Sequence, residues 1–183
     1  MAAWPLNAQA KDCFDQAAAT YQAHGVGAPL LRAIARAESD MRPDAVNNTH
    51  SRLTGTRDIG LMQINTGWLP RLARFGINEA HLFEPCTNIH VGAWILADAF
   101  SRHGASWNAV GAYNAACSQL RGEACTRARA RYAWRVYRRL DTKEAERPRQ
   151  QRPAPPAPGG LFSVAQARAS GADEGDRPAE AAK

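Results

Sequence analysis

The chain has 183 residues, 45% of them hydrophobic by a count that includes Ala and Cys, and this length is enough to enclose the core of one domain. Lys and Arg outnumber Asp and Glu by 23 to 17, which gives a formal net charge of +6 at pH 7. Seven basic and six acidic residues lie in 143–183, so about +5 of that charge belongs to residues 1–142. A basic domain attracts polyanions, whether nucleic acid, an anionic membrane face or an anionic polymer, and charge alone does not choose among them.

Membrane segments are not expected. A transmembrane helix needs about 20 mostly apolar residues, and the sequence holds no such run. Residues 1–10 lack the basic start and the apolar stretch of a signal peptide. We therefore expect neither a membrane span nor an intact signal peptide, and treat residues 1–10 as a short segment before the folded domain.

Helical periodicity dominates the first 140 residues. The predicted helices cover Lys11–Ala23, Ala28–Ser39, Thr66–Phe75 with Thr66 as its cap, Pro85–His103, Trp107–Tyr113 and about Gly122–Leu140. Residues 40–56 are rich in turn formers and predict a loop or short hairpin that lines a cleft. In the second helix, Leu31 and Ile34 line the inward face, and Arg32 and Arg36 are expected to point away.

The composition changes at Lys143 to Pro, Ala, Gly and Arg. Such a segment buries too little apolar surface to offset its ordering entropy. We predict a catalytic domain over residues 11–142 and a disordered tail over 143–183.

Four cysteines, Cys13, Cys86, Cys117 and Cys125, show no Cys-x-x-Cys metal spacing. An even number without that spacing favours disulfides, and we predict the pairs Cys117–Cys125, across a short loop, and Cys13–Cys86. Free buried thiols are the alternative. Disulfides would indicate an oxidising compartment such as a bacterial periplasm.

Glu38 is the strongest candidate for chemistry. It shares the inward face of its predicted helix, seven residues after Leu31 and four after Ile34, and lies at that helix's C-terminal end. Apolar surroundings and the negative end of the helix dipole both disfavour an ionised carboxylate there. A protonated carboxylic acid is what cleavage of a glycosidic bond requires, because the bridging oxygen leaves only when it receives a proton.

Four short phrases accompany Glu38 in a fixed order. They are Glu38-Ser39, Asp58-Ile59-Gly60-Leu61-Met62-Gln63-Ile64-Asn65, Gly111-Ala112-Tyr113-Asn114 and Arg131-Tyr132. In order and spacing they resemble the soluble lytic transglycosylases, and most closely the small enzymes attached to type III and type IV secretion systems and conjugation machines. The resemblance covers about residues 11–140. It implies a mainly helical, α+β lysozyme-like fold with two lobes and a cleft that binds the glycan strands of peptidoglycan.

The resemblance also implies roles for individual residues. Glu38 matches the acid/base, and Ser39 either supports it by a hydrogen bond or simply ends the helix. Gly60 lets the backbone approach the cleft, and Met62 and Gln63 contact sugar. Tyr113 and Asn114 hold the Glu and the N-acetyl group. Tyr132 matches a late aromatic motif, and its alternative is a place in the core. Leu61 and Ile64 are expected in the core.

Asp58 has two interpretations. It either caps a turn, or it resembles the second carboxylate of animal-type lysozymes, which would make a retaining hydrolase possible. Many transglycosylases lack such a partner and are thought to use the substrate's own acetamido oxygen, after which the 6-hydroxyl attacks and an anhydro ring forms.

The arginines of residues 127–139 alternate with Ala, Tyr, Trp and Val, which predicts a helix with one buried face and one solvated basic face. Binding of anionic wall polymer is a second use for that face, and no nucleic-acid motif accompanies the charge.

The sequence thus predicts a monomeric, periplasmic lytic transglycosylase without a metal or organic cofactor, whose tail contacts a secretion or conjugation apparatus. The alternatives are a hydrolytic muramidase, a non-catalytic glycan-binding assembly module and a basic nucleic-acid-binding protein.

Overall fold

The computed structural model describes residues 6–117 and 120–140, with side chains from residue 12 onward. The helices within these ranges are α1 (Leu6–Thr20), α2 (Ala28–Ser39), α3 (Ser51–Thr54), α4 (Leu69–Leu72), α5 (Pro85–His103), α6 (Trp107–Asn114) and α7 (Gly122–Tyr137). Short 3-10 turns, η1 (Gln22–His24), η2 (Thr66–Trp68), η3 (Ala73–Phe75) and η4 (Ala80–Phe83), connect several of them. The mainly helical prediction is confirmed.

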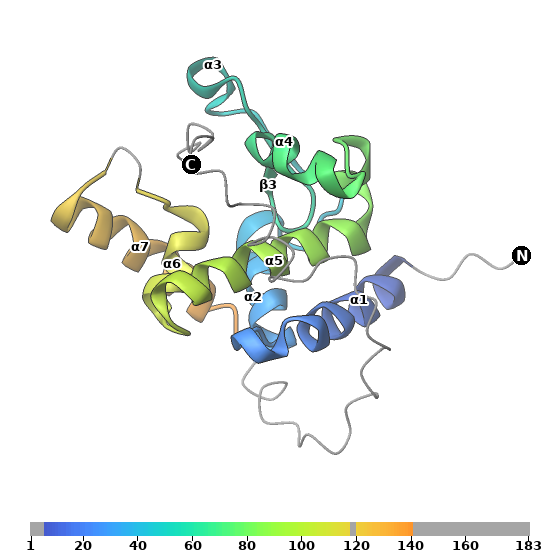
Figure 1. The fold of residues 1–183 in the computed structure, drawn as a ribbon, viewed down its shortest axis with the longest axis horizontal. Coiled ribbons are helices and arrows are strands. Elements are labelled where there is room, and N and C mark those ends of the chain that lie inside the picture. The colour runs from blue at the N-terminus through green and yellow to red at the C-terminus, as the bar shows by residue number, and fades with distance from the viewer. Residues whose placement is uncertain (1–5, 118–119, 141–183) are drawn as a thin grey trace, which may run out of the picture.

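Helix α5 forms the centre of the domain and crosses the middle of Figure 1. It packs against α1, α2 and α6, and α7 in turn packs on α6 and α2. Residues 88–97 of α5 are buried without interruption, which matches the fact that the segment is apolar on almost every side, as a helix enclosed by others must be.

A small antiparallel sheet stands apart from the helix pair α6 and α7 (Figure 1). Its strands, in the order β1-β2-β3, are β1 (Val46–Asn47), β2 (Asp58–Ile59) and β3 (Ile64–Asn65). Asp58 pairs with Asn47 on one side and with Asn65 on the other. The predicted hairpin region therefore becomes a sheet, and the short α3 projects beyond it between β1 and β2.

Two expectations for residues 66–75 were wrong in detail. The segment 66–75 is not one helix but η2, α4 and η3 in succession, because Gly67 and Pro70 interrupt regular helical hydrogen bonding. The side chain of Asn65, not Thr66, caps its start by accepting a hydrogen bond from the Gly67 amide at 2.8 Å. The Thr66 hydroxyl instead accepts from the Arg57 amide at 3.0 Å.

Arg32 does not point to solvent, as its helical position suggested, but lies buried between α2 and α1. Its guanidinium donates to the Asp15 carboxylate at 3.1 Å and lies 5.5 Å above the centre of the Phe14 ring. Periodicity could not show this, because it reports that a face is polar and not that another helix supplies a carboxylate for it.

Both predicted disulfides are confirmed. Cys13 of α1 is bonded to Cys86 at the start of α5, with their Cα atoms 5.2 Å apart and 73 residues between them in sequence. Cys117, just after α6, is bonded to Cys125 in α7 across eight residues. The described residues contain no free cysteine.

Among the helices of the described ranges, none is both long and apolar enough to cross a bilayer. The predicted tail, residues 143–183, and the segment 1–5 lie outside the described residues.

Candidate active site

Glu38 is the penultimate residue of α2 and is half-buried. The helix ends directly after it, because Asp40 and Met41 both adopt left-handed backbone angles, with φ of 54° and 64°. Within the last turn, the buried hydroxyl of Ser39 lies 2.9 Å from the carbonyl of Leu61 and 3.2 Å from that of Ala35. Ser39 therefore joins the end of α2 to the turn that follows β2, and so fixes where the neighbouring carboxylate lies.

Tyr132 of α7 contacts Glu38 directly. Its phenol donates a hydrogen bond to Glu38 Oε1 at 2.8 Å, from a ring that is almost fully buried. The ring stacks on Tyr113 with centroids 6.3 Å apart, and Arg135 lies 4.9 Å above its centre. Burial and then the negative charge of Glu38 raise the pKa of Tyr132 well above its ordinary value. Tyr132 therefore remains a hydrogen-bond donor at every physiological pH, and the structure brings this late aromatic motif to Glu38.

Tyr113, near the end of α6, reaches across to the sheet side of the domain. Its phenol donates to the backbone carbonyl of Met62 at 2.9 Å. Desolvation, and then the charges of Glu38 and Asp58, raise the pKa of Tyr113 well above its ordinary value. Both carboxylates thus act electrostatically on the same hydroxyl.

Asn114 is the last residue of α6 and is partly exposed beside Tyr113. Within the described ranges its side-chain amide makes no hydrogen bond, so the amide is free to bind a ligand. The helix ends here with the Ala115 amide donating to the carbonyl of Gly111 at 3.0 Å.

The turn between β2 and β3 differs from the expectation in three places. Gly60, with φ of 78°, faces the interior and not the cleft: a Cβ there would lie 2.4 Å from Asn88 Nδ2 and 2.7 Å from the Leu82 carbonyl. Met62 is fully buried and packs against Gly92 of α5, so its side chain belongs to the core. Leu61 and Ile64 are buried as expected.

Gln63 is also nearly buried, with a left-handed backbone at φ 47°. Its amide nitrogen donates to the carbonyls of Gly60, at 2.9 Å, and Ala45, at 3.2 Å. These bonds hold the turn against the segment that leads into β1. In this arrangement the Gln63 amide shapes the sheet side of the site and is not presented to a sugar.

Asp58 is fully buried in β2, and both of its oxygens accept hydrogen bonds. Asn65 donates to Oδ1 at 2.9 Å and Asn47 donates to Oδ2 at 3.3 Å. His50 Nε2 lies 3.8 Å from Oδ1 and 3.2 Å from the Asn65 amide nitrogen. The pairing of β2 with both neighbouring strands brings these donors together.

Sequence reasoning missed three of these polar residues, Asn47, His50 and Asn88. Asn88 is fully buried on α5 and joins the Met62 amide, the Ile59 carbonyl and the Leu82 carbonyl at 2.7 to 2.9 Å. The sequence could have indicated this role for Asn88, because an Asn in an otherwise apolar helix must form hydrogen bonds with buried partners. Asn47 and His50 gave no comparable signal, since loops commonly contain both.

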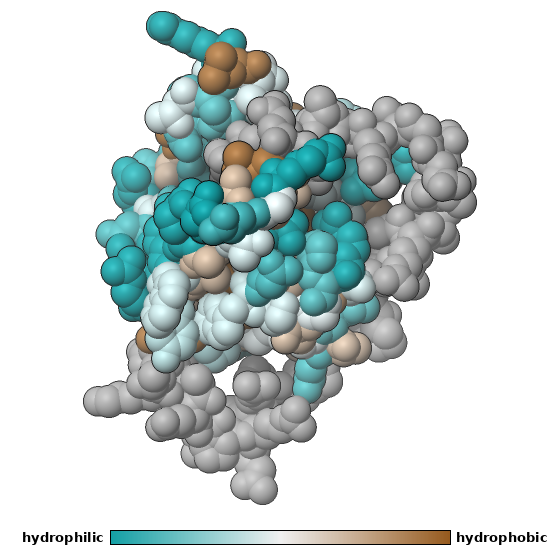
Figure 2. Space-filling view, turned by 90° about the vertical axis from the view of Figure 1, so that its left-hand side faces the viewer, coloured by the Kyte–Doolittle hydropathy of each residue, from teal (hydrophilic) through white to brown (hydrophobic). Residues whose placement is uncertain are grey.

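The basic face of α7 is largely solvated, as predicted. Arg127, Arg131, Arg135, Arg138 and Arg139 are exposed, whereas Arg129 is half-buried. Figure 2 looks onto the side on which α6 and α7 lie, and hydrophilic residues predominate in its coloured part. In the described ranges no group of three His, Cys, Asp or Glu side chains could hold a metal ion.

Comparison with known proteins shows the family of this chain. Residues 12–133, about two thirds of the chain, match the family described as Transglycosylase SLT domain. The chain therefore belongs to the SLT transglycosylase family, with a mainly helical fold, a three-stranded sheet and a carboxylate at the end of its second helix.

The chain is 42% identical to Invasion protein IagB of Salmonella typhi over 145 residues, covering 77% of this chain and 84% of the relative. It is 43% identical to X polypeptide of Escherichia coli over 131 residues, 71% and 73% of the two chains. It is 37% identical to Protein IpgF of Shigella flexneri over 129 residues, 70% and 78% of the two chains.

Proposed function

We propose that this protein is a peptidoglycan lytic transglycosylase that cleaves the β-1,4 bond between N-acetylmuramic acid and N-acetylglucosamine and leaves a 1,6-anhydro end. The observation that carries the proposal is the 2.8 Å hydrogen bond from Tyr132 to Glu38 at the end of α2. It gives the motif carboxylate a fixed orientation and a permanent donor, within a domain that matches the Transglycosylase SLT domain family.

In the first step, protonated Glu38 gives its proton to the bridging glycosidic oxygen, and the bond from that oxygen to the anomeric carbon breaks. The acetamido oxygen of the same muramic residue attacks the anomeric carbon and holds the developing positive charge. The negative charge left on Glu38 is met by the Tyr132 hydroxyl, which already points at Oε1.

In the second step, the Glu38 carboxylate removes the proton of the 6-hydroxyl. The resulting oxygen attacks the anomeric carbon and displaces the acetamido oxygen. Glu38 is protonated again, no water is consumed, and the product ends in an anhydro ring. The partly exposed amide of Asn114 is the group we assign to the N-acetyl group during both steps, because it is free of intramolecular hydrogen bonds within the described ranges.

The state of Asp58 supports this route over nucleophilic attack by the protein. A carboxylate that attacks carbon needs a free oxygen lone pair directed at the substrate. Asp58 has no exposed surface, and its two oxygens accept hydrogen bonds from Asn65 and Asn47. In this arrangement Asp58 holds Asn47 and Asn65 of the neighbouring strands in place.

One observation favours a second function, a hydrolytic muramidase. Both Glu38 and Asp58 raise the pKa of Tyr113, so the two carboxylates act on one point of the site, as do the paired carboxylates of retaining glycosidases. If the Asp58 network opens on binding substrate, Asp58 stabilises the glycosyl cation and water attacks.

The cellular context also belongs to the proposal. Two disulfides are consistent with an oxidising compartment, and we assign the protein to the periplasm. One group of relatives is named for invasion. We propose that the enzyme opens the wall locally for a secretion or conjugation apparatus, with residues 143–183 as the contact to that apparatus.

Product analysis tests the proposal. Purified sacculi are digested with the wild-type protein and with Glu38→Gln, and the soluble fragments are examined by mass spectrometry. We expect anhydro ends, one water lighter than reducing ends, from the wild type, and a loss of at least about 100-fold with Glu38→Gln, which is nearly isosteric but supplies no proton.

Each other outcome selects an alternative. Reducing ends indicate the muramidase. Sacculus binding without any product indicates the glycan-binding module, and steeply salt-dependent DNA binding would indicate the nucleic-acid-binding protein. Activity of Glu38→Gln within a few-fold of wild type refutes the assigned acid/base.

A further inference from the structure

Helices α6 and α7 come into backbone contact at one point. A Cβ at Gly111 would lie 2.5 Å from Arg129 Cβ and 2.6 Å from the Arg129 carbonyl oxygen, so only glycine fits. This crossing lies three residues before Asn114 in α6 and three residues before Tyr132 in α7. The two motif residues are therefore each about one helical turn from the same contact.

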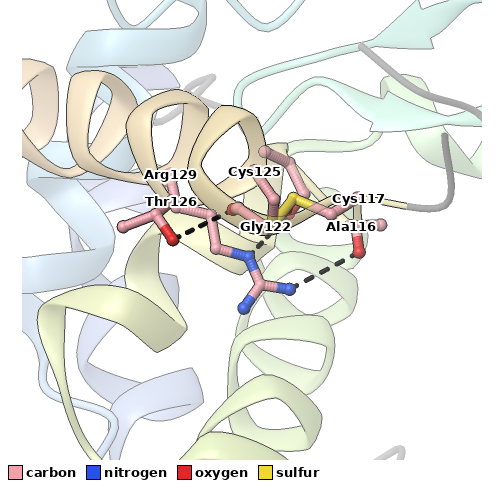
Figure 3. Close-up of a disulfide and its surroundings, with 7 residues drawn as sticks. Ala116, Cys117, Gly122, Cys125, Thr126 and Arg129 are labelled. Atoms are coloured by element: carbon pink, nitrogen blue, oxygen red, sulfur yellow. Dashed lines mark hydrogen bonds between the residues drawn. A yellow bond between two sulfur atoms is a disulfide. The ribbon is translucent and has the colours of Figure 1, made fainter. Parts of the chain in front are cut away.

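The side chain of Arg129 extends from this contact to the segment that follows Asn114. Its Nε donates to the Ala115 carbonyl at 3.1 Å and its Nη2 donates to the Ala116 carbonyl at 3.4 Å. Figure 3 shows the guanidinium beside the chain that leaves α6. The last carbonyls of a helix lack intrahelical donors and carry the negative end of its dipole, so the bond from Arg129 to the C-cap carbonyl of Ala115 stabilises the end of α6.

The Cys117–Cys125 disulfide ties the same segment to α7 a second time. It joins the residue that follows Ala116 to a residue one turn before Arg129 (Figure 3). Cys117 has a left-handed backbone with φ of 64°, which a residue with a side chain adopts only where its surroundings hold it. Residues 115–117 are thus fixed by a guanidinium and a covalent bond, both from α7.

We propose that Arg129 is a positioning residue for the sugar-binding amide of Asn114, setting its place relative to Tyr132 and Glu38. Arg129 does not touch substrate. It links the segment after Asn114 to α7, the helix whose Tyr132 donates to Glu38. The distance between the Asn114 amide and the Glu38 carboxyl is thereby kept constant. This inference rests on the proposed function, in which Asn114 binds the N-acetyl group.

Arginine is suited to this role in a way that lysine is not. Its planar guanidinium offers donors in a fixed geometry and can bond two neighbouring carbonyls at once. A lysine ammonium keeps the charge but is a single flexible point. The position therefore predicts a graded response: Arg129→Lys should keep part of the effect, and Arg129→Gln little of it.

Selectivity for the N-acetyl group is the readout, because general loss of stability does not alter it. Binding of the N-acetylglucosamine pentamer and of its de-N-acetylated counterpart is measured by titration calorimetry, with Glu38→Gln in every protein so that nothing is cleaved. Asn114→Ala serves as the benchmark. Arg127→Gln is the matched control, since it removes the same charge from an exposed site on the same helix, where Arg127 pairs with Glu123.

We expect Asn114→Ala to reduce the ratio of the two affinities about tenfold, the value of one lost hydrogen bond. Arg129→Gln should reduce the ratio similarly, Arg129→Lys by less, and Arg127→Gln not at all. Combining Arg129→Gln with Asn114→Ala should add nothing further, because both act on one contact. Should Arg129→Gln prove unfolded by circular dichroism, Arg129→Lys carries the test.

Unchanged selectivity in folded Arg129→Gln, or in folded Arg129→Lys where the Gln variant does not fold, would overturn the inference. So would full additivity with Asn114→Ala, or an Asn114→Ala variant with normal selectivity. None of these results bears on the acid/base role of Glu38, which the product analysis of active protein decides separately.

Discussion

Replacing Tyr132 by Phe removes one oxygen from the site and leaves the ring in place. The ring is almost fully buried, stacked on Tyr113 and covered by Arg135, and Phe retains these contacts. What is lost is the 2.8 Å hydrogen bond to Glu38 Oε1. A hydrogen bond to a charged group contributes about 1.5–3 kcal/mol.

That loss falls on the step in which Glu38 becomes a carboxylate. Since about 1.4 kcal/mol corresponds to tenfold in rate, we expect Tyr132→Phe to lower kcat by a factor of about 10 to 100. KM should change little, because the bond is strongest when Glu38 is charged and not when substrate first binds. The fall in Tm should not exceed about 10 °C, the equivalent of the whole bond in a domain of this size.

The assay is the rate of release of soluble fragments from purified sacculi, together with thermal unfolding. Tyr137→Phe is the matched control: it lies five residues further along, has a half-exposed ring against Trp107 and Trp134, and should retain wild-type activity. A Tyr132→Phe rate within twofold of wild type would show that the hydrogen bond does not contribute to catalysis. A rate loss that merely follows a large fall in Tm would show a packing effect instead.

Three further predictions concern stability and the domain boundary. Reductant should lower Tm, since each disulfide contributes about 2–4 kcal/mol by restricting the unfolded chain; four titratable thiols in the unreduced, denatured protein would contradict the pairing. His90 is buried with Nδ1 unbonded among the described residues, and burial lowers its pKa below 6.5, so the folded state takes up its proton less readily than the unfolded state and stability is lost as pH falls through about 6.5. Thermal unfolding between pH 7 and 5 should therefore show a smaller loss for His90→Gln than for wild type, and equal losses would remove His90 as the cause. A chain ending at Thr142 should keep full activity on sacculi, because every motif precedes Leu140; loss of activity on truncation would place residues 143–183 in the site.

The helices were predictable where one face of the segment is strongly apolar. The bounds of α2 and α5 match the periodicity, because Pro near each start and the turn residues beyond each end leave little freedom. Segment 66–75 was not predictable in this way. Its apolar residues repeat at helical spacing, but Gly67 and Pro70 divide the backbone into short turns.

The motif residues also fall into a predictable and an unpredictable group. Order and spacing in the sequence identified Glu38, Tyr113, Asn114 and Tyr132, and the structure brings Tyr132 to Glu38 and Tyr113 beside it. For Gly60, Met62 and Gln63 the motif predicted a place at the cleft or a contact with sugar, whereas the structure buries the side chains of Met62 and Gln63. These residues face the interior and hold the turn. Asn88 of α5 lies against Gly60 and accepts from the Met62 amide, whereas the Gln63 amide donates to the carbonyls of Gly60 and Ala45.

The sequence by itself determined the helical composition and pointed to Glu38 as the candidate acid, since these depend on local periodicity and on a motif that is continuous along the chain; the cysteine spacing favoured disulfides, and the structure shows the pairs. Only the tertiary structure decided which polar groups meet. Asp58 finds Asn47 and Asn65 through strand pairing, Glu38 finds Tyr132 across 94 residues, and Arg129 finds the carbonyls after Asn114. Each partner comes from a separate element. A hydrogen bond between distant segments depends on how those elements pack, and no local sequence pattern contains that information.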